Sequence, residues 1–104
     1  MSTQVEPFTI VFPKWYDERV EFETTAKGFL RDVEVWLEDG SRHMLFFIDP
    51  VRLQQDLEAD TQDGRPYYAE PGIVVLPEVT TESVRRAVAG LWRDGYFKRL
   101  PPHA

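Results

Sequence analysis

The sequence predicts a single small α+β domain over residues 1–104, with a mainly antiparallel sheet of about five strands and two helices packed on one face. Three observations predict this fold class. A β-hairpin pattern surrounds residues 39–40, an amphipathic helix pattern spans residues 84–94, and 104 residues are enough for one hydrophobic core. The expected order of elements along the chain is β-β-β-β-α-β-α.

Alternating apolar side chains near the N-terminus predict the first two strands. Residues 8–12 alternate until Pro13 ends the run. Residues 20–23 alternate again, with Val20 and Phe22 on one side and two glutamates on the other. That pattern is typical of a half-buried strand with its acidic side chains in solvent.

The clearest local pattern is the β-hairpin. Two runs rich in strand-forming residues, 33–38 and 42–48, flank a short Asp-Gly turn. A two-residue turn would pair Val35 with Met44, whereas a bulged turn would pair Val35 with His43. The sequence leaves both registers open.

A helix is expected to begin at Asp49-Pro50, because the aspartate can accept from an unpaired backbone N–H and proline has no N–H to lose. This helix should span residues 50–59. Its narrow apolar stripe, chiefly Pro50, Leu53 and Leu57, predicts a surface helix that covers a sheet face.

One more strand and one more helix complete the expected fold. Residues 73–76 form an unbroken apolar run, which is typical of a central strand. The helix that contains residues 84–94 should have its N-cap at Thr80 and its end at Gly95. Its apolar stripe is expected to face the core and consists of Val84, Ala87, Val88, Leu91 and Trp92.

Charge is distributed unevenly along the chain, whose formal net charge is −6. Residues 1–83 carry 7 basic and 17 acidic side chains, a net charge of −10, whereas residues 84–104 carry 5 basic and 1 acidic, a net charge of +4. An acidic field repels a phosphate backbone and attracts a basic protein. A basic protein is therefore the expected partner, and nucleic acid is not.

Several classes of function are excluded by what the chain lacks. With no cysteine it has no disulfide, no thiolate metal site and no catalytic thiol. The six glycines form no nucleotide-binding motif. The acidic stretch 56–64 fails as a calcium loop, because Ala59 would stand at the first ligand position. No cofactor and no metal are therefore expected.

The ends of the chain and its hydropathy bear on location. No apolar run approaches the roughly 20 residues of a membrane span, so no membrane partner is expected. Residues 1–7 lack the basic start of a secretory signal, which makes the cytoplasm the expected location. Residues 1–6 and 100–104 are expected to be flexible.

Four residues are candidates for a small polar binding site: Tyr67, Tyr68, Glu70 and His43. The loop 67–72 directly precedes an expected central strand, and loops at strand ends often carry function. His43 could work with Glu34 or Trp36 on the neighbouring hairpin strand. The plainer interpretation is that one tyrosine packs, the other lies on the surface, and His43 is an exposed or half-packed neighbour of an aromatic ring.

A basic patch is expected on and just after the second helix, and it consists of Arg85, Arg86, Arg93, Lys98 and Arg99. Interleaved aromatic residues could suit nucleic acid. Against this, Trp92 is expected in the core, and Glu82 can pair with Arg85 and Arg86. A solvated helix face is the plainer interpretation, with an anion site or a partner contact as the alternatives.

These observations favour a non-enzymatic interaction or regulatory module whose acidic surface binds a basic protein partner. One alternative is a small-molecule-binding domain or minor enzyme with a site near residues 67–72 and His43. A second alternative is a structural domain that self-associates through an exposed strand edge.

Overall fold

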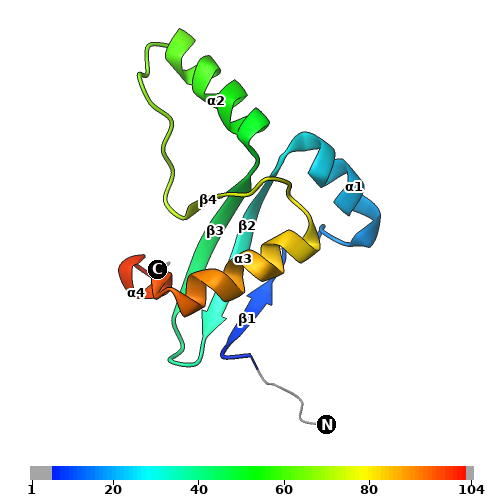
Figure 1. Ribbon diagram of the computed structural model, residues 1–104, viewed down its shortest axis with the longest axis vertical. Helices are drawn as coiled ribbons and strands as arrows, with labels where there is room; N and C mark the ends of the chain where they lie inside the picture. The colour runs from blue at the N-terminus through cyan, green and yellow to red at the C-terminus, as the bar shows by residue number, and fades with distance from the viewer. Residues whose placement is uncertain (1–5, 103–104) are drawn as a thin grey trace.

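The computed structural model describes residues 6–102 and has an α+β fold (Figure 1). Of the ends predicted to be flexible, residues 1–5 and 103–104 lie outside this range. The described residues form four strands and four helices: β1 (Phe8–Val11), α1 (Glu18–Lys27), β2 (Phe29–Leu37), β3 (Arg42–Ile48), α2 (Pro50–Gln62), β4 (Ile73–Val75), α3 (Thr81–Arg93) and α4 (Tyr96–Arg99).

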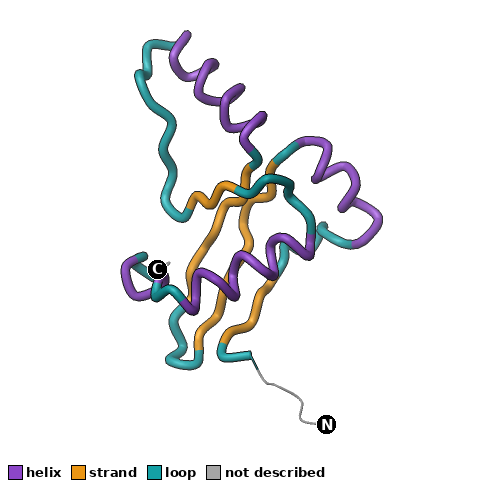
Figure 2. The backbone as a smooth tube through the Cα atoms, in the orientation of Figure 1, coloured by secondary structure: helices purple, strands orange, loops and turns teal. Residues whose placement is uncertain are grey.

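The sheet has the order β1-β2-β3-β4, so the prediction of about five strands is one too many for the described residues. β1 pairs with β2 and β2 with β3 in antiparallel fashion, but β3 and β4 are parallel. A parallel pair requires the chain to return to the starting end of β3. Helix α2 and the long loop after it make that return (Figure 2). The sheet is therefore mixed.

The hairpin has the bulged register. Val35 lies opposite His43, and the Leu37 amide donates to the Ser41 carbonyl at 2.9 Å. Gly40 has φ 87°, a left-handed conformation that the bulged turn requires and that glycine adopts without strain. This register places His43 on the same sheet face as Val35.

The predicted strand at residues 20–23 is wrong, because these residues belong to α1. The Asp17 side chain accepts from the backbone N–H groups of Arg19 and Val20, and this N-cap starts a helix. Four alternating residues are too few to outweigh a capped helix start. Phe22 is consequently 81% exposed rather than half-buried in a sheet.

Helix α3 covers one face of the sheet and supplies the predicted amphipathic stripe (Figure 1). The Thr80 N-cap is confirmed, and Ser83 completes a capping box with it. Val84 and Val88 are fully buried against the sheet. The core consists of Phe8, Leu30, Val33, Val35, Leu45, Phe47, Leu76, Val79, Val84, Val88 and Phe97.

Trp92 does not belong to this buried core. Its side chain is 44% exposed, although its ring centroid lies 6.4 Å from that of Phe8. The left-handed Gly95 turns the chain directly after α3. Phe97 of α4 is buried in the core, while Trp92 lies at the core margin.

Helix α2 does not cover a sheet face. None of its 13 residues, all within the described range, is buried, and it projects beyond the end of the sheet in Figure 1. The Asp49 N-cap and Pro50 are confirmed. The polar Arg52 side chain covers the Phe29 ring at 4.6 Å, so a charged residue rather than the apolar stripe meets the sheet. A strand-helix-strand crossover is thus present without the packing that usually accompanies it.

Strand β4 lies at the edge of the sheet rather than at its centre. It is only three residues long, and Val75 is 49% exposed. The unbroken apolar run arises because Val74 packs against the core while its neighbours face the side of the sheet that α3 leaves open. An apolar run alone does not distinguish an edge strand from a central strand.

Candidate binding surfaces

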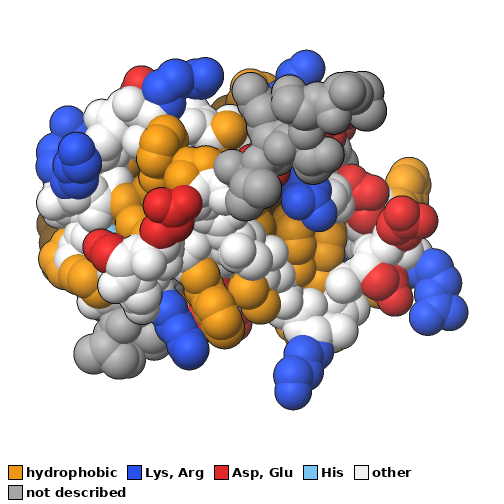
Figure 3. Space-filling model, turned by 90° about the horizontal axis from the view of Figure 1, so that it is seen from below, with side chains coloured by type: hydrophobic (Ala, Val, Ile, Leu, Met, Phe, Trp, Pro, Cys, Tyr) orange, Lys and Arg blue, Asp and Glu red, His pale blue; other side chains and the backbone are white. Residues whose placement is uncertain are grey.

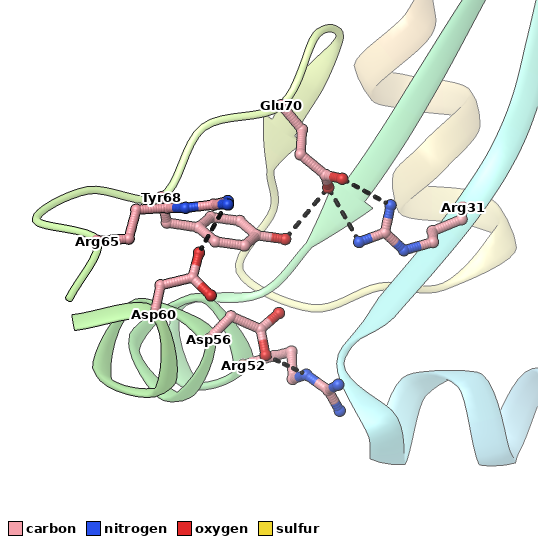
Figure 4. A network of polar contacts seen from close by, with 7 residues as sticks. All are labelled: Arg31, Arg52, Asp56, Asp60, Arg65, Tyr68 and Glu70. Atoms are coloured by element: carbon pink, nitrogen blue, oxygen red, sulfur yellow. Dashed lines mark hydrogen bonds and ion pairs between the residues drawn. The ribbon is translucent and has the colours of Figure 1, made fainter. Parts of the chain in front are cut away.

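The loop before β4 is tied to β2 by a polar network (Figure 4). Arg31 and Glu70 form an ion pair at 2.9 Å, and the Tyr68 hydroxyl donates to Glu70 at 3.2 Å. The Arg31 guanidinium also lies 4.0 Å from the Phe46 ring centroid. Arg31 stands at a bulge of β2, next to Asp32 with φ 62°. A left-handed aspartate is strained, and such strain is often stored at functional positions.

Two of the four predicted polar-site residues therefore meet, and the other two lie apart from them. Tyr68 and Glu70 interact directly. Tyr67 is 59% exposed. His43 lines a different concavity from the one that Glu70 lines. Because Glu70 neutralises Arg31, the Tyr68 network is better suited to holding the loop than to binding a charged ligand.

Burial, together with the Glu70 carboxylate, raises the pKa of Tyr68 to about 12. Between pH 10 and 12 the unfolded chain loses the Tyr68 proton while the folded chain keeps it, so the free energy of unfolding falls as pH rises through this window. We expect Glu70→Gln to lower the pKa of Tyr68 only partly, because burial is the larger cause. Ultraviolet absorbance titration of Glu70→Gln against Tyr68→Phe measures this shift. An unchanged highest tyrosine step in Glu70→Gln would contradict it.

Two further ion pairs lie beside this network, both made by residues of α2 or the loop that follows it (Figure 4). Arg52 pairs with Asp56 at 3.0 Å, and Arg65 pairs with Asp60 at 3.8 Å. The arginines of this segment are thus already matched with acids of the same segment. The charged side chains of this segment that form no ion pair are therefore all acidic.

His43 is buried, with 1% exposure, so neither an exposed nor a half-packed position is found. Its ring centroid lies 5.0 Å from that of Phe97. Glu34 and Trp36, the predicted neighbours, bond to each other on the opposite face of β2. Burial lowers the pKa of His43, and the Asp39 carboxylate opposes part of that shift.

The polar contacts of His43 are incomplete. Ser41 Oγ lies 3.4 Å from His43 Nε2 and donates its own hydrogen to Asp39 at 2.6 Å. Ser41 can therefore only accept from the imidazole, which places the neutral ring's hydrogen on Nε2. Nδ1 has no hydrogen-bond partner among the described residues. An unpaired buried nitrogen is uncommon in folded proteins.

His43 lines a concavity of about 610 Å³ between the end of the hairpin and the corner of α3 and α4. We call it the hairpin cleft. Its lining includes Ser41, Trp92, Arg93, Lys98 and Arg99. The structure thus joins one member of the predicted polar site to three members of the predicted basic patch.

The basic patch itself divides in two. Arg86 is exposed and pairs with Glu82 at 3.5 Å, while Arg85 lies over the Phe12 ring at 5.4 Å. Arg93, Lys98 and Arg99 instead line the hairpin cleft. Figure 3 shows Lys and Arg side chains around the edge of one face of the molecule, with hydrophobic side chains between them.

The fold and these surfaces define a small α+β domain with a projecting helix and a cation-lined cleft. Comparisons with family models, with curated proteins and with solved structures find no match to the chain. Residues 6–102 contain no cluster of three or more acidic or histidine side chains placed to hold a metal ion. In that same range, no helix is both long enough and apolar enough to cross a membrane.

Sequence reasoning missed Arg31 and Ser41. Arg31 precedes the predicted strand and becomes important only because the loop returns beside it, a contact 39 residues away along the chain. Ser41 lies two residues from His43, and side chains two residues apart on an extended segment point to the same face in either register. That spacing was a usable signal.

Proposed function

We propose that the protein is a non-enzymatic interaction module that presents the acidic helix α2 to a basic protein partner. The observation that carries the proposal is the exposure of α2, whose 13 residues include none that is buried. Apolar helix faces in small domains usually pack on their own sheet. Here Val51 is 68% exposed and Leu57 39% exposed. A partner that covers this face would remove apolar area from water.

The chemistry of the partner follows from charge. Residues 49–65 carry five acidic and two basic side chains, a net charge of −3. Both basic residues, Arg52 and Arg65, are paired with acids of the segment. Glu58 lies on the same face as Leu53 and Leu57. A basic amphipathic segment complements such a surface through apolar contact at its centre and charge at its rim.

Two matched variants test the proposal. Leu57→Ser removes an apolar side chain from α2, and Phe22→Ser removes one from α1, where it is 81% exposed. Neither site lies in the core, so both variants should fold. In pull-downs at low salt, we expect a net basic protein to be retained by the unaltered chain and by Phe22→Ser. Leu57→Ser should retain it roughly tenfold less, the loss expected for one buried leucine.

Further measurements test the role of charge and separate a basic partner from self-association. Raised salt and Glu58→Lys should each release the same partner, because both weaken attraction to a basic surface. Equal retention by Leu57→Ser and Phe22→Ser would contradict the role of α2, as would the retention of no partner. Light scattering that finds a dimer abolished by Leu57→Ser would replace the basic partner with a second copy of the chain.

A further inference from the structure

The hairpin cleft gathers cationic side chains that the rest of the described chain leaves unpaired. Five arginines outside the cleft form ion pairs, namely Arg19, Arg31, Arg52, Arg65 and Arg86. Arg42 and Arg85 instead lie over the rings of Trp36 and Phe12. Within residues 6–102, no ion pair includes Arg93, Lys98 or Arg99, and these three line the cleft together. In a chain of net charge −6, three unpaired cations around one concavity form a local site of the opposite sign.

The cleft also holds one acid. Asp39 lies on its lining and accepts from the Ser41 backbone N–H at 2.8 Å and from the Ser41 hydroxyl at 2.6 Å. These hydrogen bonds hold the pKa of Asp39 below its ordinary value, so the carboxylate stays charged. Three cations against one anion leave a charge of +2. A phosphate monoester carries about −1.5 to −2 at neutral pH and matches it.

The remaining lining is apolar or incompletely bonded. Trp92 is 44% exposed, and both Trp92 and Phe97 line the cleft. His43 contributes its buried ring, whose Nδ1 has no hydrogen-bond partner within residues 6–102. A volume of about 610 Å³ lies within the range of small-molecule sites, which combine apolar walls with a few polar groups.

We propose that the hairpin cleft binds a small phosphate monoester that carries a flat apolar group. The phosphate is held by Arg93, Lys98 and Arg99, and the flat group lies against Trp92. Arginine suits this ligand because its planar guanidinium makes paired hydrogen bonds to phosphate oxygens. The site lies apart from α2 and does not depend on the function proposed for that helix.

The test adds phenyl phosphate to the full chain and measures its binding from the amide shifts in two-dimensional NMR spectra. We expect its addition to shift the amides of Ser41, His43 and Gly95 while leaving those of α2 in place. Inorganic phosphate lacks the ring and benzoate lacks the second charge, so both should bind more weakly. Binding of inorganic phosphate as tight as that of phenyl phosphate would overturn the apolar half of the proposal.

Matched charge variants separate the site from general attraction. Arg93→Gln and Lys98→Gln should each weaken phenyl phosphate about tenfold, the loss of one charge-assisted hydrogen bond. Arg86→Gln removes the same charge from the exposed side of α3 and should leave the affinity unchanged. Equal weakening by all three variants would overturn the site. Tighter, variant-sensitive binding of a short single-stranded oligonucleotide would assign the cleft to nucleic acid instead.

The pKa of His43 provides a second test, because it reports whether the phosphate binds near the ring. In the free protein burial lowers the pKa of His43, and the Asp39 carboxylate opposes part of that shift. A phosphate bound in the same cleft would add negative charge near the ring, which favours the imidazolium, so the pKa of His43 should rise when phenyl phosphate binds. An unchanged imidazole titration at saturating phenyl phosphate would overturn the placement of the anion beside His43.

Discussion

Phe47→Ala is expected to lower the free energy of unfolding by about 3–5 kcal/mol, the cost of truncating a buried phenylalanine. Phe47 lies on β3 with 0% exposure and belongs to the core that α3 covers. Urea unfolding followed by circular dichroism measures the loss. Because this cost approaches the whole stability of many small domains, the variant should be partly unfolded near room temperature.

Trp92→Ala is the informative comparison, since it removes a larger side chain from a residue that is 44% exposed. We expect it to cost about 1–2 kcal/mol, less than Phe47→Ala, because only part of its area leaves water on folding. A cost for Trp92→Ala equal to that for Phe47→Ala would place Trp92 inside the core and contradict the structure.

Gly72→Ala should cost about 3 kcal/mol or more, through backbone geometry rather than lost packing. Gly72 has φ 72°, and an added Cβ would collide with the Met44 carbonyl oxygen of β3. Its own carbonyl accepts from the Phe46 backbone N–H at 3.0 Å, so neither strand can move aside freely. The loop would then lose its attachment to the edge of the sheet.

Gly64→Ala serves as the control for backbone strain alone. Gly64 has φ 91°, but an added Cβ there meets nothing within 4 Å. Its expected cost is about 1–2 kcal/mol, the penalty for a left-handed alanine. If the two alanine variants unfold at the same urea concentration, the close contact between Gly72 and β3 is wrong.

Elements marked by both a pattern and an end signal could be predicted from the sequence. Helix α3 has an apolar stripe with Thr80 at one end and Gly95 at the other, and the structure has both. The hairpin could be predicted from its Asp-Gly turn, but the sequence left two registers open and the structure has the bulged one. Four alternating residues predict a strand where helix α1 lies, because that pattern carries no information about the N-cap that Asp17 supplies.

The surfaces were harder to predict than the elements, because they depend on where the chain returns. Residues 31 and 70 meet only after α2 and its loop bring the chain back to the sheet. The narrow stripe of α2 predicts a helix that faces the sheet, but nothing local to a helix says whether its own domain covers it. The hairpin cleft likewise joins residues from β3 and α4 that are distant in sequence.

Hydrogen exchange on the free protein and on its complex with the partner retained at low salt tests the role of α2 most directly. In the free protein the amides of residues 50–62 should exchange faster than those of β2, because no residue of α2 is buried. In the complex the amides of α2 should be slowed while those of β2 are unchanged. Protection confined to other elements, with α2 exchanging as in the free protein, would contradict the account.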